Sequence, residues 1–269
     1  MTAPPHTLCA AHHVRIAGIE VCSVTEAEVA DLARRAWAQG SGCQVVTANT
    51  DILRHAARDP AAKALVDRAT AVVADGMPLI WASRILGDPL PERVTGSSLI
   101  FSLSEAAAAE GRTVYVLGGA PGVPEKAAER LRERCPGLQV AGTDSPPFGF
   151  DADPAAVAAV VERVRASCAD MVFVGMGFPR QEQLIERLVE AHPQAFYLGC
   201  GAAVPMAAGV VDRAPGLLQR SGLEWLYRLL REPGRLARRY LRNDLVFALG
   251  LMVSTSRIRV TTRGGSAAD

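Results

Sequence analysis

Short apolar segments alternate with longer amphipathic segments along most of this chain, and this alternation constrains the fold more than any other feature. A short apolar run bounded by turn residues is typical of a buried strand, and a longer amphipathic segment is typical of a helix. We expect strands over 43–47, 71–74, 113–117, 138–141, 171–174 and 195–198. We expect helices over 25–39, 49–58, 60–68, 77–86, 97–110, 154–167 and 180–191, with another that ends at Cys135. Strands separated by helices form parallel sheets covered on both faces, so the pattern predicts a Rossmann-like α/β fold with a mostly parallel sheet.

The chain changes character after about residue 210. Residues 211–269 hold eleven arginines and five acidic residues, although the net charge of all 269 residues is only +1. Helical structure is expected over 223–243, where arginines recur every three or four residues and therefore share one helix face. These are Arg228, Arg231, Arg235, Arg238 and Arg242. We divide the chain into a core, 1–210, and a basic helical C-terminal appendage, 211–269. The arginine face suits an anionic ligand or an anionic lipid surface; a solvated face with incidental arginines is the alternative.

Several classes of protein are disfavoured. A net charge near zero gives no sign of nucleic-acid binding. The six cysteines form no Cys-x-x-Cys pair and no zinc-like cluster with histidine, which favours a reduced, cytosolic protein without a metal site. No signal peptide is expected at the N-terminus, and the longest apolar run, 245–253, is too short to cross a bilayer. Asp151-Ala-Asp153 resembles a metal-binding pair, but Pro154 follows it, so Asp153 is expected to cap a helix. The last residues, 263–269, are expected to be disordered.

Three of the expected strands are followed by pairs of glycines. Ligands of open parallel sheets bind beyond the carboxyl ends of the strands, where glycine lets backbone N–H groups approach a phosphate. The candidate nucleotide-binding residues are therefore Gly118, Gly119, Gly175, Gly177, Gly199 and Gly201. Ordinary strand-to-helix turns are the alternative. The chain contains neither a Gly-x-Gly-x-x-Gly fingerprint after these strands nor a Gly-Lys-Ser/Thr sequence, which disfavours NAD binding and ATP hydrolysis.

Polar side chains follow the strands at the same edge of the predicted sheet. Asp75 ends an apolar strand, where its carboxylate could act as a general base or could cap the next helix. Thr47 and Asn49 end the preceding strand and could bind a substrate hydroxyl or phosphate, with an N-cap as the alternative for Asn49. Gln181, at the start of a helix, could form a hydrogen bond with a ligand. Its neighbour Glu182 is expected only to favour the helix dipole.

Seven motifs in the same order and spacing resemble the WecG/TagA/CpsF glycosyltransferases, which form glycosyltransferase family twenty-six. They are Thr47-Ala-Asn49, Ala74-Asp-Gly-Met77, Pro91-Glu-Arg-Val-Thr-Gly96, Val116-Leu-Gly-Gly-Ala-Pro-Gly122, Val174-Gly-Met-Gly-Phe-Pro-Arg-Gln-Glu182, Arg213-Ala-Pro215, and Leu223-Glu-Trp-Leu-Tyr-Arg228 with Glu232-Pro-Gly-Arg235. The resemblance runs from about residue 16 to residue 243. It implies an inverting, metal-independent enzyme without a cofactor. Such an enzyme moves a sugar from a UDP-sugar to a polyprenyl-diphosphate-linked saccharide, in the synthesis of cell-surface polysaccharide or teichoic-acid-type polymers.

The resemblance also implies roles for individual residues. Asp75 would deprotonate the acceptor hydroxyl; Thr47, Asn49 and Gln181 would line the sugar or acceptor site, with Arg93 nearby. A set of appendage arginines would bind the diphosphate on the inner face of the cytoplasmic membrane. These are Arg228, Arg231, Arg235 and Arg238. A homo-oligomer is compatible with the same resemblance.

Two departures from the family pattern leave the donor sugar open between N-acetylmannosamine, its uronic acid and a hexose such as glucose. This chain has Val204-Pro205 where many relatives carry Phe-Asp, and its loop over 144–150 reads Asp-Ser-Pro-Pro-Phe-Gly-Phe. A non-catalytic module that binds a nucleotide or an anionic lipid is the alternative function.

Overall fold

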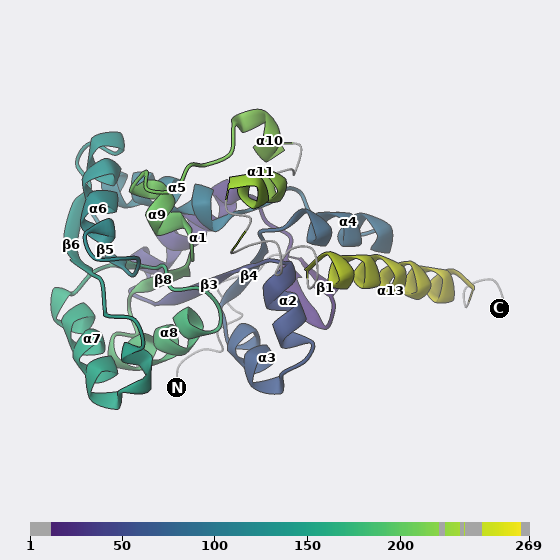
Figure 1. Ribbon diagram of the computed structural model, residues 1–269, viewed down its shortest axis with the longest axis horizontal. Coiled ribbons are helices and arrows are strands. Elements are labelled where there is room, and N and C mark those ends of the chain that lie inside the picture. Colours follow the sequence, from purple (N-terminus) through teal and green to yellow (C-terminus); the bar gives the residue numbers. More distant parts are fainter. Residues whose placement is uncertain (1–11, 221–223, 232–233, 235–243, 265–269) are drawn as a thin grey trace.

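The computed structural model describes residues 12–220, 224–231, 234 and 244–264, and its centre is a six-stranded sheet (Figure 1). All pairings within this sheet are parallel, in the order β4-β3-β8-β7-β5-β6. The strands are β3 (Cys43–Ala48), β4 (Ala71–Ala74), β5 (Thr113–Leu117), β6 (Gln139–Asp144), β7 (Met171–Val174) and β8 (Phe196–Gly199). The predicted α/β class and strand positions are confirmed, and the sheet is wholly parallel.

Helices cover both faces of the sheet (Figure 1). They are α1 (Glu26–Ala38), α2 (Thr50–Ala56), α3 (Pro60–Asp67), α4 (Met77–Leu86), α5 (Gly96–Ala109), α6 (Val123–Arg134), α7 (Pro154–Ser167), α8 (Arg180–Ala191), α9 (Ala203–Ala207), α10 (Gly216–Arg220), α11 (Glu224–Arg231) and α13 (Leu245–Gly264), with a short 3₁₀ turn at Phe150–Ala152. Several begin at caps that the sequence indicates. Thr25 and Glu28 form a capping box before α1, and Asp153 caps α7 through the amide of Ala155, with Pro154 in the first helical position.

Alternate residues of the strands pack on opposite faces. Val45 and Val73 join a cluster with α1, α5, α6 and α9, whereas Val46 and Val72 pack with α2, α4 and a small hairpin. A third apolar cluster joins α7 and α8 to β5, β7 and β8. This burial on both faces explains why all the strands except the edge strand β6 read as nearly continuous apolar runs.

The sequence analysis did not predict the hairpin, which is formed by β1 (His13–Ile16) and β2 (Ile19–Cys22). Ala17 and Gly18 make its two-residue turn, and both have positive φ. Strands of four residues are too short for their periodicity to be distinctive. The hairpin packs its apolar side against the α4 region and extends the second face of the core.

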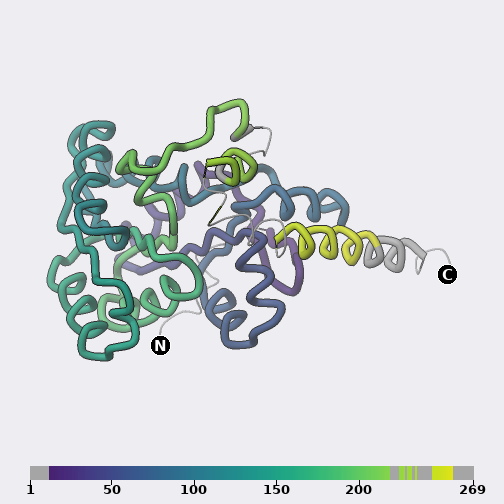
Figure 2. The backbone as a smooth tube through the Cα atoms, viewed as in Figure 1, coloured from purple at the N-terminus to yellow at the C-terminus, as the bar shows by residue number. Residues whose placement is uncertain are grey.

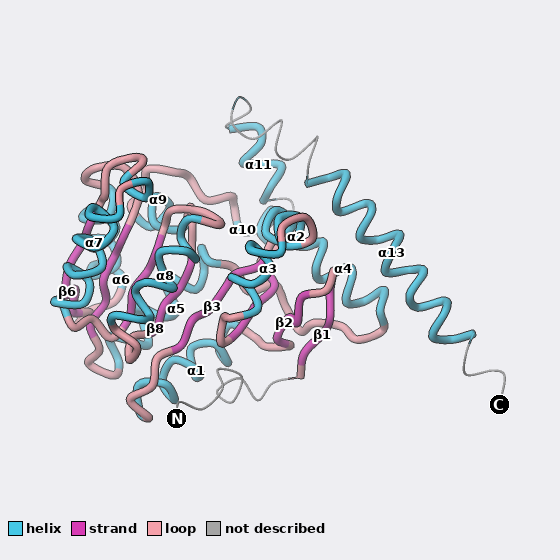
Figure 3. The backbone as a smooth tube through the Cα atoms, turned by 90° about the horizontal axis from the view of Figure 1, so that it is seen from below, coloured by secondary structure: helices cyan, strands magenta, loops and turns pink. Residues whose placement is uncertain are grey.

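The longest described helix of the C-terminal segment, α13, packs along α4 and runs past the sheet (Figures 2 and 3). Leu251 of α13 is buried in the same apolar cluster as α2, α4 and the hairpin. In contrast, Val246, Leu249 and Val253 of α13 are exposed. The expected disorder of the last residues is wrong for 263 and 264, which end α13; 265–269 lie outside the described residues. Of the helical structure expected over 223–243, α11 is described, whereas 235–243 are not. Within the described ranges, no helix combines the length and apolarity that a membrane span needs.

Candidate functional site

A cavity of about 770 Å³ opens at the carboxyl ends of β3, β4, β7 and β8. Its lining includes these residues that the sequence singled out: Thr47, Asn49, Asp75, Arg93, Gly119, Gly175, Gly177, Gln181 and Gly201. The C-terminal segment adds Glu224, Trp225, Asp244, Leu245 and Ala248 to the lining. Of the described candidates, Gly118, Gly199 and Arg231 lie outside the lining. The cavity therefore brings together the edge of the sheet and the C-terminal segment, as expected for the ligand edge of an open parallel sheet.

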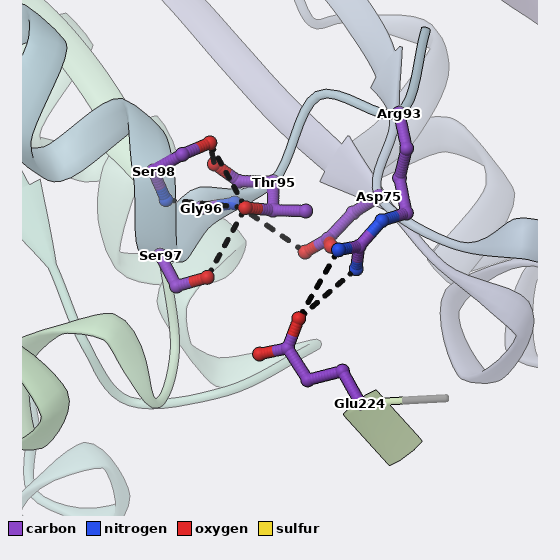
Figure 4. Close-up of polar contacts among 7 residues, drawn as sticks. All are labelled: Asp75, Arg93, Thr95, Gly96, Ser97, Ser98 and Glu224. Atoms are coloured by element: carbon purple, nitrogen blue, oxygen red, sulfur yellow. Dashed lines mark hydrogen bonds and ion pairs between the residues drawn. The ribbon is translucent and has the colours of Figure 1, made fainter. Parts of the chain in front are cut away.

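Asp75 follows β4 and faces this cavity (Figure 4). Its Oδ2 atom accepts a hydrogen bond of 3.4 Å from the amide of Gly96, the first residue of α5. The residue that caps α4 is Gly76, without a side-chain bond, so Asp75 does not take the capping role that the sequence left open. This contact places the carboxylate at the N-terminus of α5.

Arg93 and Glu224 form an ion pair in the cavity lining (Figure 4). Nη1 and Nη2 of Arg93 each lie 3.2 Å from the same oxygen, Oε2 of Glu224. The two side chains are only 17% and 10% exposed. Arg93 lies just before α5, and Glu224 is the first residue of α11, so this pair joins the C-terminal segment to the core beside Asp75.

Thr47 and Asn49 use their side chains within the protein. Thr47 donates through Oγ1 to the carbonyl of Gly199 over 3.1 Å, and this bond links β3 to β8. Asn49 accepts at Oδ1 from the amides of Asp51 and Ile52, which confirms that it caps α2. Both residues line the cavity, and their contact with a substrate stays a prediction.

Several of the candidate glycines already donate hydrogen bonds within the protein. The amides of Gly118 and Gly175 donate to backbone carbonyls of the neighbouring strands, and the amides of Gly177 and Gly201 donate to Oε1 of Gln181. A Cβ at Gly118 would lie 2.7 Å from the carbonyl oxygen of Gly175, so no larger residue fits there. Close packing therefore explains Gly118 and Gly175, whereas Gly177 has open space around it and a positive φ of 79°. A role of these glycines in nucleotide binding stays a prediction.

The arginine face of the appendage is only partly described. Arg231 is an exposed residue whose guanidinium lies 3.6 Å from Asp212 and 5.4 Å from the ring centre of Tyr227. The side chain of Arg228, and all of Arg235 and Arg238, lie outside the described residues. Among the residues that are described, no group of three or more His, Cys, Asp or Glu side chains is placed to hold a metal ion.

The family model of the WecG/TagA/CpsF glycosyl transferases matches residues 14–260 of this chain. The chain belongs to this family. A curated relative from Bacillus spizizenii is 35% identical over 197 residues, which cover 73% of this chain and 74% of the relative. The relative is named N-acetylglucosaminyldiphosphoundecaprenol N-acetyl-beta-D-mannosaminyltransferase. The protein is therefore a glycosyltransferase, and the resemblance inferred from the seven motifs is confirmed.

Two ionic contacts of this glycosyltransferase were missed in the sequence. Arg54 of α2 pairs with Asp51 on its own helix and with Asp244, 3.4 Å away, just before α13. Both aspartates line the cavity. Glu224, the partner of Arg93, stands inside the motif 223–228, but only the three-dimensional structure shows that it reaches Arg93. No periodicity or spacing indicates the contacts Arg54–Asp244 and Arg93–Glu224, because the members of each pair lie more than a hundred residues apart.

Glu182 is a fully buried acid at the start of α8, where the sequence predicted only a favourable contact with the helix dipole. Oε1 accepts a hydrogen bond of 2.8 Å from Nε2 of Gln181, and Oε2 has no hydrogen-bond partner within the described part of the chain. Burial raises the pKa of this carboxyl from 4.5 to about 7, although the bond from Gln181 opposes the shift. In the folded protein, the carboxyl of Glu182 therefore keeps its proton at pH values where an exposed glutamate has lost it.

Replacing Glu182 with glutamine should flatten the dependence of stability on pH. The folded-state pKa lies above the unfolded-state value, so the stability that the bound proton confers is complete below about pH 4.5 and is lost as pH rises to about 7. The loss is on the order of 3 kcal/mol for the wild type and is absent in Glu182→Gln. Thermal unfolding should therefore show a larger gain from Glu182→Gln at pH 8 than at pH 5. Glu190→Gln, which changes an exposed glutamate of the same helix, is the control; equal pH profiles for all three proteins would contradict this assignment.

Proposed function

We propose that this glycosyltransferase moves an N-acetylmannosaminyl group from its UDP-linked donor to a polyprenyl-diphosphate-linked N-acetylglucosamine. The name of the Bacillus spizizenii relative supports both the transferred group and the lipid-linked acceptor. A cavity of about 770 Å³ has a volume suited to a nucleotide sugar. Acceptors of this kind carry growing saccharides on a lipid, so the proposed pathway is the synthesis of a cell-surface polymer.

The single observation that carries the proposed mechanism is the position of Asp75 in the cavity. The carboxylate takes the proton of the acceptor hydroxyl while that oxygen forms a bond to the anomeric carbon of the donor. The bond from the anomeric carbon to the diphosphate breaks, and UDP leaves with the electron pair. Attack from the face opposite to UDP inverts the configuration, so an α-linked donor gives a β-linked product. The relative is named for a β-linked mannosaminyl group, which agrees with inversion.

The diphosphate of the donor gains negative charge as UDP leaves. Arg93 offers a guanidinium in the cavity lining, where a charge-assisted hydrogen bond to a phosphate oxygen would stabilise this charge. We propose that the appendage arginines, Arg228, Arg231, Arg235 and Arg238, supply further positive charge. The proposed reaction uses no metal ion.

The acceptor places the reaction at a membrane surface, because its polyprenyl chain is embedded in lipid. The exposed apolar residues of α13, Val246, Leu249 and Val253, support peripheral contact with this surface. We propose that the enzyme works on the inner face of the cytoplasmic membrane, where nucleotide sugars are made.

A UDP-release assay tests the proposed function. Purified enzyme is given a short-chain polyprenyl-diphosphate N-acetylglucosamine and, in turn, UDP-N-acetylmannosamine, its uronic acid and UDP-glucose. We expect release to require the acceptor, to be fastest with UDP-N-acetylmannosamine, to give a β-linked product by NMR, and to continue in excess EDTA. Binding of UDP without release from any pair of substrates would contradict the proposal and would favour a non-catalytic binding module.

A further inference from the structure

The buried carboxyl of Glu182 is joined by hydrogen bonds to two loops of the cavity. Gln181 lies between them: its Nε2 donates to Glu182, and its Oε1 accepts from the amide of Gly177 at 2.9 Å and from the amide of Gly201 at 3.1 Å. Gly177 belongs to the loop after β7 and Gly201 to the loop after β8. Both glycines, and Gln181 itself, line the cavity.

The amide group of Gln181 has two ends that differ in chemistry, and only one orientation suits this arrangement. With Oε1 toward the loops, one acceptor meets two N–H donors. With the amide turned over, its NH₂ group would face the amides of Gly177 and Gly201. All three of these groups are hydrogen-bond donors, so none would find an acceptor in this contact. The acceptor on Glu182 selects the first orientation, because Nε2 then has a partner as well.

We propose that Glu182 is a positioning residue of the donor site: by orienting the amide of Gln181, it fixes the distance between the loops after β7 and β8 and so the shape of the cavity where the nucleotide sugar binds. The inference rests on the proposed function for its substrate.

The backbone of β8 lies very close to the side chains of Gln181 and Glu182. A Cβ on Gly199, at the end of β8, would lie 2.6 Å from Nε2 of Gln181 and 2.7 Å from Oε1 of Glu182. Glycine at this position lets the two side chains lie directly against the strand. Burying a carboxyl lowers stability, and an apolar residue of similar volume is often more stable in such a place. The hydrogen bond to Gln181, and not packing, is therefore what distinguishes Glu182 from an apolar residue of similar volume.

The test compares Glu182→Leu with Glu182→Gln. Leucine fills the space without an acceptor, whereas glutamine keeps an oxygen for Nε2 of Gln181. We expect Glu182→Leu to raise the KM for the UDP-sugar, and the Kd for UDP, about tenfold, with a smaller change in kcat, and Glu182→Gln to restore most of this loss. A purely structural role would lower the fraction of folded enzyme and hence the apparent kcat, with KM unchanged. A result of that kind, or equal damage in both variants, would overturn the proposal.

Hydrogen exchange gives a readout that does not depend on the reaction. In Glu182→Leu, the amides of Gly177 and Gly201 should exchange about tenfold faster than in the wild type, and in Glu182→Gln they should exchange at the wild-type rate. Unchanged exchange at both amides in Glu182→Leu would overturn the inference even where the transfer assay succeeds. If no UDP-sugar is a substrate, faster exchange still supports the loop contact while the proposed function fails.

Two further variants keep the test interpretable. Gly199→Ala pushes on the pair from the strand side, so it should raise KM and speed exchange at the same two amides while the carboxyl of Glu182 is still present. Glu190→Leu replaces an exposed glutamate of the same helix and should change neither quantity. If Glu182→Leu does not fold, Gly199→Ala decides the matter: wild-type KM and exchange in that variant would contradict the proposal.

Discussion

Replacing Asp75 with asparagine should lower kcat for sugar transfer by about 10²–10⁴-fold, the contribution typical of a general base. Asparagine has nearly the same shape and keeps an oxygen that can accept from the amide of Gly96, but it cannot take up the proton of the acceptor hydroxyl. Binding of UDP should change less than about threefold, because the lost group acts on the acceptor. UDP release and calorimetric binding of UDP measure the two quantities.

Asp67→Asn is the matched control for this change. Asp67 is an exposed aspartate at the end of α3 that pairs with Lys63, and its replacement should leave both kcat and UDP binding unchanged. Turnover by Asp75→Asn close to that of the wild type would show that the proton goes elsewhere. Loss of UDP binding together with turnover would instead place Asp75 in the binding of the nucleotide.

Replacing Arg93 with methionine should lower kcat/KM about 100-fold, the second large effect we expect. The change removes a guanidinium from the cavity and leaves the carboxylate of Glu224 nearly buried without its charged partner. Removing one member of a buried pair costs about 3–5 kcal/mol, because the remaining charge is uncompensated. That charge would also repel the diphosphate of the donor. Steady-state kinetics with varied UDP-sugar gives the size of the loss.

The double variant Arg93→Met with Glu224→Gln separates these two causes. Glutamine removes the stranded charge, so the double variant should be about tenfold more active than Arg93→Met alone, and the two effects should not add. Arg112→Met, which breaks an ion pair with Asp170 at the opposite edge of the sheet, should have little effect on kcat/KM. Additive losses would show that Glu224 acts independently of Arg93.

Local patterns in the sequence predicted much of the fold. Every strand of the sheet except β6 is buried on both faces, so the apolar runs of these strands stand out. Several helices begin at residues whose side chains bond nearby amides. The predicted alternation of strands and helices also placed Asp75 at the edge of the sheet where ligands bind, since a parallel sheet brings the carboxyl ends of all its strands together. These features depend on neighbours within a few residues, or on one general rule of topology.

Other features of the site depend on contacts that no local pattern contains. The pairing of Arg93 with Glu224 joins residues that are 131 positions apart, and that of Arg54 with Asp244 joins residues 190 positions apart. The glycines after the strands were correctly placed at the edge of the sheet, but the sequence could not show that several of their amides are already bonded within the protein. Glu182 was underestimated because its burial follows from how α8 packs beneath β8, and not from its position in the helix.

The most direct test of the central claim is a crystal structure of the Asp75→Asn variant with an intact UDP-sugar and a short-chain acceptor. The claim is that the carboxyl edge of the sheet holds the donor while the side chain at position 75 meets the acceptor. We predict that the acceptor hydroxyl will lie within about 3 Å of the asparagine side chain, facing the anomeric carbon, with the diphosphate toward Arg93. A donor sugar bound outside this cavity, or an acceptor hydroxyl turned away from position 75, would contradict the claim.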